Sequence, residues 1–133
     1  MRVADIMQTE LQVIAATDII EAAVAVLADH HVSGLPVVDD EGRFVGVISN
    51  SDILEALAEH TEPAERERIF TKMEVRELMT PRPQTISPDA TIRDAAQRML
   101  YLEVHRLFVE SQGRLVGVVS TTDLVRTLAA AKV

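Results

Sequence analysis

The sequence reads GVISNSD at residues 46–52 and GVVSTTD at residues 117–123. Four of the seven positions are identical, and both stretches keep one Gly, one Ser and one Asp at the same spacing. A β-branched run is typical of a strand, and a Ser followed three residues later by an acid is a pattern that begins helices. The two stretches therefore predict the same strand-to-helix junction twice in one chain.

The repeat extends over most of the 133 residues. VADIM at residues 3–7 aligns with VRELM at residues 75–79 at an offset of 72 residues, and the offset falls to 71 between Asp52 and Asp123. The offset changes where DDEGR at residues 39–43 aligns with the shorter SQGR at residues 111–114. Both are Gly-containing polar stretches of the kind that form hairpin loops, which tolerate a change of length. An internal duplication of this kind predicts two similar structural units.

Each repeat contains the same order of local patterns. Apolar residues recur at helical spacing after residue 18 in the first repeat and after residue 91 in the second. Two short β-branched runs joined by a turn at Gly42 or Gly113 follow, and then a second helical pattern. With one more short strand before the first helix, each repeat is predicted to fold as β-α-β-β-α.

The predicted boundaries are residues 1–60 for the first repeat and residues 74–133 for the second. Residues 61–73 are rich in charge and break the pattern, so we expect a solvated linker, with a helical part left open. A unit of about 60 residues is marginally stable alone. The two halves are therefore expected to pack on each other with pseudo-twofold symmetry.

Composition excludes several classes of function. The absence of Cys excludes disulfides and thiolate metal sites, and the four His residues lack metal-ligand spacing. A formal net charge of −8 argues against nucleic acid as a partner. No apolar run of about 18 residues is present, which argues against a membrane span. Residues 1–10 include acidic residues and lack the long apolar segment of a secretory signal, so we expect a cytoplasmic protein. No nucleophile–base pair stands out, so we expect neither an enzyme nor a required cofactor.

The ordered set of motifs resembles a tandem pair of CBS domains, a family named after cystathionine β-synthase. The resemblance is carried by DIM at residues 5–7, SGLPVVDDEGRFVGVISNSD at 33–52, ELMTP at 77–81 and HRLFVESQGRLVGVVSTTD at 105–123. It implies an α+β fold in which the two repeats pack sheet to sheet and form two related clefts. It also implies a stand-alone regulatory module that senses an adenosine-containing ligand, such as AMP, ADP, ATP or S-adenosylmethionine, and signals to a partner enzyme or transporter.

The acid that ends each repeated stretch is the first candidate for ligand binding. A carboxylate can accept hydrogen bonds from two neighbouring ribose hydroxyls. In the family the acid at this position holds the ribose, which carries over to Asp52 and Asp123. Candidate hydroxyls for sugar or phosphate are those of Ser49, Ser51, Ser120 and Thr122. From the residues alone, a capping box that only begins a helix is the favoured explanation, and the resemblance is what favours a ligand in at least one of the two clefts.

A His-Arg pair distinguishes the two repeats. His105 and Arg106 stand where the first repeat has Ser33 and Gly34. In the family a His-Arg at this place contacts nucleotide phosphates, and the resemblance implies that the pair serves the ligand whose ribose lies at Asp52. Arg suits phosphate because of its planar donor fork. The alternative is an exposed Arg that pairs with one of the many acids.

Four apolar residues and two glycines complete the candidates. The resemblance implies that Ile14, Pro36, Ile86 and Phe108 line base pockets, and ordinary core packing is the alternative for each. Gly46 and Gly117 lie inside strand patterns, which indicates the close approach of a ligand or of the facing repeat.

Apolar helix faces predict a homodimer. We expect the exposed apolar residues of these faces to include Leu54, Leu57, Leu124 and Leu128. The resemblance implies a dimer of modules arranged as a flat disc. The competing interpretation of the whole chain is a structural module for dimerisation or docking whose clefts stay empty.

Overall fold

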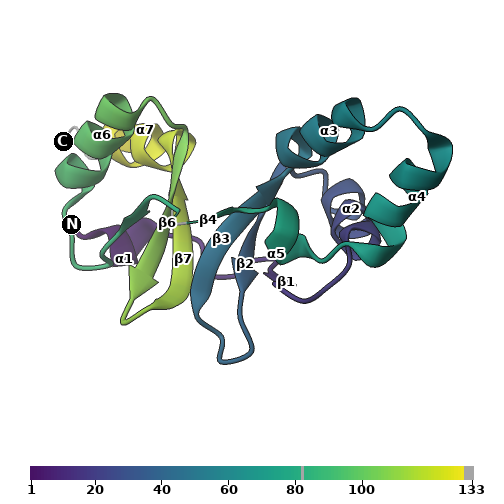
Figure 1. Ribbon diagram of the computed structural model, residues 1–133. Coiled ribbons are helices and arrows are strands. Elements are labelled where there is room, and N and C mark those ends of the chain that lie inside the picture. Colours follow the sequence, from purple (N-terminus) through teal and green to yellow (C-terminus); the bar gives the residue numbers. More distant parts are fainter. Residues whose placement is uncertain (82, 131–133) are drawn as a thin grey trace. The chain divides into compact units, whose positions relative to one another are not determined.

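The computed structural model describes residues 1–81 and 83–130 and has a mixed α+β fold with two sheets (Figure 1). The elements in chain order are α1 (Val3–Ile6), β1 (Ile14–Ala15), α2 (Ile20–Asp29), β2 (Gly34–Val38), β3 (Phe44–Ser49), α3 (Asn50–Glu59), α4 (Pro63–Lys72), α5 (Val75–Leu78), β4 (Thr80–Pro81), β5 (Thr85–Ile86), α6 (Ile92–Leu102), β6 (Arg106–Ser111), β7 (Arg114–Ser120) and α7 (Thr121–Ala130). The β-α-β-β-α order predicted for each repeat is confirmed as β1-α2-β2-β3-α3 and β5-α6-β6-β7-α7.

The compact units of the chain exchange the first residues of the two sequence repeats. Unit 1 consists of Met1–Leu11 and the chain from Gln84 onward, whereas unit 2 is Gln12–Pro83. The backbone N–H of Val3 donates to the carbonyl of Ala90 at 2.8 Å, which ties α1 to the second repeat. The N–H of Val75 correspondingly donates to the carbonyl of Asp18 at 2.7 Å and ties α5 to the first. The repeat boundaries predicted from the sequence thus differ from the units that pack together.

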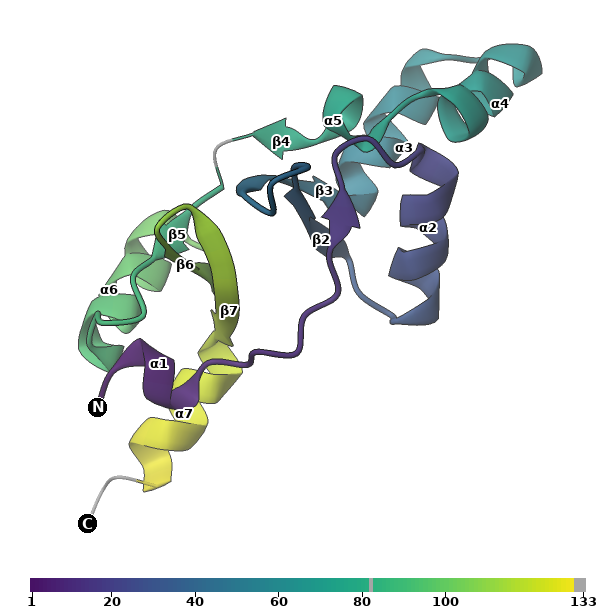
Figure 2. The ribbon, with the colours of Figure 1, turned by 90° about the horizontal axis from the view of Figure 1, so that it is seen from below.

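Each unit has its own sheet (Figure 2), and the two sheets share the arrangement of three strands, to which unit 2 adds β4. The strand order is β1-β2-β3-β4 in unit 2 and β5-β6-β7 in unit 1, and in each sheet a parallel pair is followed by an antiparallel hairpin. A bulge lies between Val37 and Val38 and, at the aligned place, between Val109 and Glu110. The hairpin turns contain Gly42 and Gly113 at φ of 78° and 79°, a backbone conformation that glycine adopts readily.

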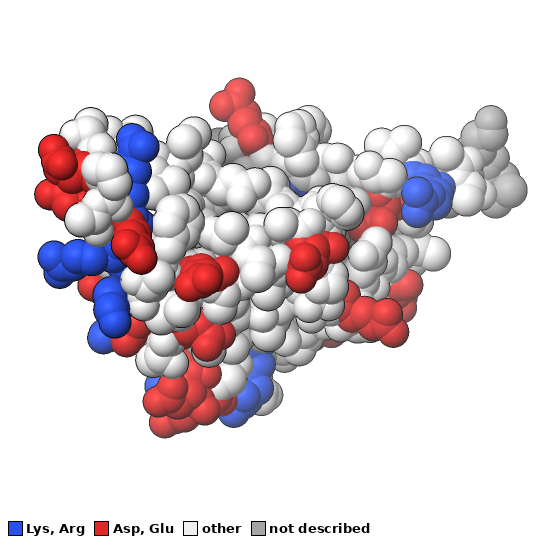
Figure 3. All heavy atoms as spheres, turned by 90° about the vertical axis from the view of Figure 1, so that its right-hand side faces the viewer, with Lys and Arg blue, Asp and Glu red and all other residues white. Residues whose placement is uncertain are grey.

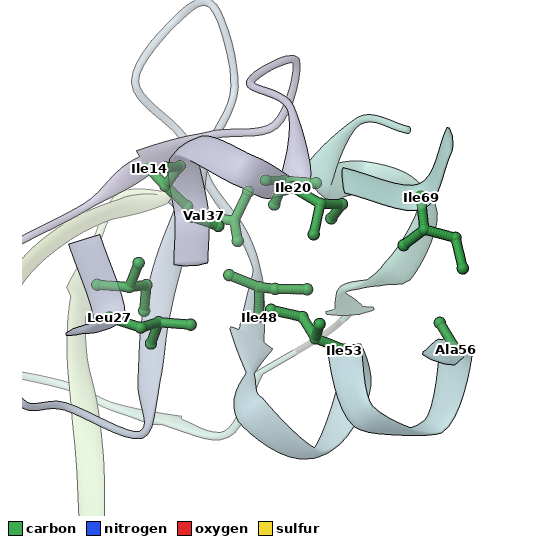
Figure 4. Packing of buried hydrophobic residues seen from close by; sticks show 11 residues of the cluster. Ile14, Ile20, Leu27, Val37, Ile48, Ile53, Ala56 and Ile69 are labelled. Atoms are coloured by element: carbon green, nitrogen blue, oxygen red, sulfur yellow. The ribbon is translucent and has the colours of Figure 1, made fainter. Parts of the chain in front are cut away.

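The core of unit 2 includes a residue from the segment predicted to be a linker. Residues 63–72 form α4, which packs against α2 and α3. Ile69 of α4 is 3% exposed and lies at the edge of the core cluster near Ala56 (Figure 4). Most of this helix is exposed, as expected of a solvated segment, but it is helical and contributes Ile69 to the core.

The core of unit 1 is smaller. Val3 from α1 joins residues of α6, β6, β7 and α7 in this cluster. Of the four leucines expected on apolar surfaces, Leu124 is buried in this core and Leu57 is half-buried against the core of unit 2. Leu54 and Leu128 are exposed, as expected.

The two strand glycines provide room for the exchanged segments. A Cβ atom added to Gly46 would lie 2.6 Å from Sδ of Met79 and 2.8 Å from the carbonyl oxygen of Thr80. At Gly117 the corresponding atoms are Sδ of Met7 at 2.6 Å and the carbonyl oxygen of Gln8 at 2.9 Å. Of the two explanations offered by the sequence, close packing by the other repeat is the one observed. Gly thus permits the VADIM and VRELM segments to cross the hairpins.

Candidate functional site

Asp52 lies in the first turn of α3 and forms a network with two neighbouring hydroxyl groups. Its Oδ2 atom accepts hydrogen bonds from the backbone N–H and the Oγ hydroxyl of Ser49, both at 2.9 Å. The backbone N–H of Asp52 donates to Ser49 Oγ at 3.2 Å, which completes a capping box. The hydroxyl of Thr80, from β4, donates to the other oxygen, Oδ1, at 3.1 Å. Asp52 therefore uses one oxygen to begin the helix and the other to bind a side chain of the exchanged segment.

Asp123 occupies the aligned place at the start of α7. Its Oδ2 atom accepts from the backbone N–H of Ser120 at 3.0 Å, and its own N–H donates to Ser120 Oγ at 3.1 Å. Among the described residues no hydrogen bond to Oδ1 of Asp123 is present. The residue aligned with Thr80 is Gln8. The cap is thus repeated, whereas the hydroxyl contact to Oδ1 occurs in unit 2 only.

Both carboxylates are half-buried at the open end of a hairpin. A carboxylate offers about four lone-pair positions, two on each oxygen. The caps use Oδ2, so Oδ1 retains at least one acceptor position in Asp52 and, with respect to residues 1–81 and 83–130, two in Asp123. The capping and ligand-binding explanations are therefore compatible, because they need different oxygens.

Ser51 and Thr122 are exposed in the first turns of α3 and α7. Neither takes part in a cap. Their hydroxyls lie beside Asp52 and Asp123 in the chain and remain candidates for contact with a ligand.

His105 and Arg106 lie at the start of β6 and belong to unit 1. Both residues are exposed. The carbonyl of His105 accepts from the N–H of Thr121 at 2.9 Å, and Arg106 pairs with Ser120 in the sheet. The pair thus stands at the same end of the unit 1 hairpin as the cap of α7.

The first repeat has the same backbone arrangement without the His and Arg side chains. The N–H of Asn50 donates to the carbonyl of Ser33 at 2.9 Å, and Gly34 pairs with Ser49. The difference between the repeats at this place is therefore one of side-chain chemistry. The implied sharing of one ligand by Arg106 and Asp52 stays a prediction.

The four apolar candidates belong mainly to the cores. Ile14 and Ile86 are 4% and 9% exposed and are members of the two core clusters. Pro36 is buried in β2, and Phe108 is half-buried in β6. Core packing therefore accounts for the two isoleucines, and the base-pocket role of all four stays a prediction.

Thr80 is the residue that sequence reasoning missed. It follows the VRELM motif at residues 75–79. The alignment of this motif with VADIM revealed the repeat but did not show which part of the fold the motif packs against. The feature of the sequence that could have indicated Thr80 is the glycine at position 46 inside a strand pattern. Met79 packs against Gly46, and the next residue, Thr80, pairs with Val47 toward the open end of the same hairpin. Thr80 adds a hydroxyl to the candidate residues around Asp52.

The charge of the chain is unevenly divided. Unit 1 contains seven basic and seven acidic residues, whereas unit 2 contains six basic and fourteen acidic ones. Unit 2 thus carries the whole formal net charge of −8. Acidic side chains are spread across the face seen in Figure 3, which views the right-hand side of Figure 1. A basic pair at the start of β6 therefore lies in the unit that presents the lesser barrier to an anion.

Two carboxyl groups outside the candidate site have lowered pKa values. A hydrogen bond from the backbone N–H of Arg43 lowers the pKa of Asp39 in the β2–β3 turn. The backbone N–H of Thr91 does the same for Asp94, which forms a capping box at the start of α6. Both groups stabilise local backbone structure.

Two absences hold for the described part of the chain. No group of three or more His, Cys, Asp or Glu side chains could hold a metal ion there. Within residues 1–81 and 83–130, no helix has the length and apolar character needed to cross a membrane.

Comparison with known proteins identifies relatives along the whole chain. The family model for the CBS domain matches twice, at residues 3–59 and 75–130. MJ1426 of Methanocaldococcus jannaschii is 30% identical over 96% of this chain and 91% of its own length. The chain spans 58% of another relative, the chloroplastic CBSX1 of Arabidopsis thaliana.

Two solved structures of similar proteins contain adenosine compounds. CBSX2 in complex with AMP is 30% identical, with a TM-score of 0.79 over 99% of both chains. The CBS domain pair of MJ0100, in complex with 5′-methylthioadenosine and S-adenosyl-L-methionine, is 28% identical, with a TM-score of 0.73 over 99% of this chain and 98% of that one. The duplicated motifs, the two β-α-β-β-α units and these matches show that the chain belongs to the CBS domain family, as a tandem pair.

Proposed function

We propose that this CBS pair is a regulatory module that binds an adenine nucleotide of the AMP, ADP or ATP class. The main supporting observation is that the two carboxylate oxygens of Asp52 have different partners. Oδ2 accepts from the backbone N–H of Ser49 in the helix cap, and Oδ1 accepts from the hydroxyl of Thr80. A ribose presents two such hydroxyls. The AMP complex of CBSX2 supports the choice of ligand class, because that protein is similar over nearly the whole chain.

Ribose binding at Asp52 requires only a small rearrangement. Thr80 is exposed, and its hydroxyl can rotate away from Oδ1 to accept or donate elsewhere. A ribose hydroxyl then replaces it in a charge-assisted hydrogen bond, while the Ser49 cap stays in place. At Asp123 no described residue donates a hydrogen bond to Oδ1, so a ribose hydroxyl would not have to displace a partner in that part of the chain. The carboxylate of each unit is therefore assigned to a ribose.

Other candidates supply the rest of the recognition. The hydroxyls of Ser49, Ser51, Ser120 and Thr122 are assigned to sugar or phosphate, and His105 with Arg106 to phosphate. The base is assigned to the surroundings of Ile14 and Pro36 in unit 2 and of Ile86 and Phe108 in unit 1. The proposal also includes a homodimer and a partner enzyme or transporter that receives the signal.

Two further candidates are favoured by specific observations. The complex of MJ0100 favours S-adenosylmethionine, which is a sulfonium compound, or the thioether 5′-methylthioadenosine, and neither would need a phosphate contact. A structural module with empty clefts is favoured by the completed cap of Asp52, because the fold does not depend on a ligand at that carboxylate. A nucleotide site would need both Arg106 and Asp52, an S-adenosylmethionine site would need Asp52 without a phosphate contact from Arg106, and a structural module would need neither for ligand binding.

Isothermal titration calorimetry with AMP, ATP, adenosine and S-adenosylmethionine tests the proposal. We expect AMP or ATP to bind more tightly than adenosine, and binding to weaken in Asp52→Asn, Asp123→Asn or both. S-adenosylmethionine as the tightest ligand would replace the nucleotide proposal. No heat of binding and no shift in melting temperature with any of the four would leave the structural module as the function.

A further inference from the structure

We propose that Thr80 determines how strongly the Asp52 carboxylate binds a ribose, because its hydroxyl occupies an acceptor position that the sugar requires. The inference rests on the proposed function and distinguishes its two carboxylates. Two neighbouring ribose hydroxyls need two acceptor positions, and a carboxylate offers about four. The number of positions already in use therefore decides whether a ribose can bind without displacing a partner.

Three donors already contact the carboxylate of Asp52. The backbone N–H and the hydroxyl of Ser49 both donate to Oδ2 at 2.9 Å. The hydroxyl of Thr80 donates to Oδ1 at 3.1 Å. About one of the four acceptor positions is left for a ligand. A ribose can place one hydroxyl there, and its second hydroxyl must displace one of the present donors.

Thr80 is the donor that a ribose displaces most readily. The hydroxyl of Ser49 also accepts from the backbone N–H of Asp52 at 3.2 Å, so its displacement would weaken the cap of α3. Thr80 is exposed, and it is paired with Val47 in the sheet through its backbone and not through its hydroxyl. Rotation of the Thr80 side chain thus frees Oδ1 while β4 stays in place.

Asp123 has no competing donor of this kind. Within residues 1–81 and 83–130, only the backbone N–H of Ser120 donates to its carboxylate, at 3.0 Å. Gln8, which is aligned with Thr80, exchanges backbone hydrogen bonds with Val118, and its side chain donates none to Asp123. About three acceptor positions remain in this part of the chain, which is enough for both hydroxyls of a ribose.

The difference between the carboxylates predicts a difference in specificity. Asp52 should distinguish AMP from 2′-deoxy-AMP poorly, since one hydroxyl fills its remaining position and the second must compete with Thr80. Asp123 should prefer AMP more strongly, since both hydroxyls of the ribose find an acceptor there and the analogue leaves one acceptor unpaired. Removal of the Thr80 hydroxyl should give Asp52 a preference of the same kind.

A protein with one ribose carboxylate tests this role. Asp123→Asn leaves Asp52, and calorimetry then compares AMP with 2′-deoxy-AMP. In this background Thr80→Val removes the hydroxyl and keeps a β-branched side chain that suits a strand. We expect AMP to bind about 10-fold more tightly and the affinity for 2′-deoxy-AMP to change by less than about 3-fold. Thr71→Val is the matched control and should alter neither affinity, because the Thr71 hydroxyl donates to the carbonyl of Glu67 within α4.

The possible results separate the inference from the proposed function. Unchanged or weaker AMP binding in Thr80→Val, or an equal gain for both nucleotides, would overturn the role of Thr80 and leave the nucleotide proposal standing. Absence of AMP binding in the wild type and in every variant would contradict the proposed function, and the inference with it. Circular dichroism checks the fold of each variant. If Thr80→Val does not fold, Thr80→Ala takes its place, because it also lacks the hydroxyl.

Discussion

The replacement Gly46→Ala tests the exchange of segments between the two repeats. The added Cβ atom would lie 2.6 Å from Met79 Sδ, 2.8 Å from the carbonyl oxygen of Thr80 and 3.1 Å from Met79 Cγ. The sulfur belongs to a flexible side chain and can move. The carbonyl cannot move independently, because Thr80 pairs with Val47 in the sheet. The clash must therefore loosen the pairing of β3 with β4 or shift the Met79 side chain out of its place in the core.

Overpacking of this kind costs about 1–3 kcal/mol. With a urea dependence of about 2 kcal/mol per molar, the unfolding midpoint should fall by about 0.5–1.5 M. The assay is urea unfolding followed by circular dichroism. Gly34→Ala is the matched control, since Gly34 lies in the neighbouring strand and its added Cβ would approach nothing closer than 3.5 Å. The control should change the free energy of unfolding by less than about 0.5 kcal/mol.

A double-mutant cycle separates the two parts of the clash. In a Met79→Ala background, Gly46→Ala should cost less than in the wild type, with a coupling of at least about 0.5 kcal/mol. The cost that remains measures the contact with the Thr80 carbonyl. An unchanged midpoint for Gly46→Ala in the wild type would refute the close approach of the VRELM segment to β3.

Three further predictions concern α4, a helix cap and a candidate phosphate contact. Ile69→Ala should lower the free energy of unfolding by about 2–5 kcal/mol because Ile69 is buried, whereas Leu54→Ala at an exposed position should have little effect, as urea unfolding would measure. Asp94→Asn should reduce the loss of stability on acidification below about pH 4, and equal unfolding curves for both proteins at pH 3 and 7 would contradict this. The reason is that a carboxyl whose pKa is lowered in the folded state stabilises the protein above its ordinary pKa and loses this effect as the pH falls. Arg106→Ala should weaken AMP binding about 10- to 100-fold and adenosine binding much less, and equal AMP affinity by calorimetry would remove Arg106 from the site.

Local signals in the sequence predicted the elements of each repeat. Helical spacing placed α2 and α6, and turn residues placed both hairpins, because these features depend on neighbouring residues. The capping boxes at Ser49 and Thr91 follow from short motifs in the same way.

Features that depend on distant residues were missed or left open. Ile69 and Phe70 form a short apolar pair in a charged segment, and only packing against α2 and α3 makes Ile69 part of the core. The contact between Thr80 and Asp52 spans 28 residues and depends on the exchange of segments. The roles of Asp52 and Asp123 could be proposed but not decided, since a cap and a ribose site require the same residue types. In the structure the caps use Oδ2 of each carboxylate, so a cap and a ribose contact are compatible, and the ribose role stays a prediction.

The most direct test of the central claim compares AMP with 2′-deoxy-AMP by calorimetry, for the wild type and for Asp52→Asn and Asp123→Asn. The amide oxygen of Asn can accept the hydrogen bond that each carboxylate now accepts from the backbone N–H of Ser49 or Ser120, so both variants should fold. A site that pairs hydroxyls rejects an analogue lacking one, and we expect the wild type to bind 2′-deoxy-AMP about 10- to 100-fold more weakly than AMP. The preference should shrink in whichever variant removes the ribose contact. Equal affinity of the wild type for both nucleotides would contradict the claim and leave GVISNSD and GVVSTTD as helix caps alone.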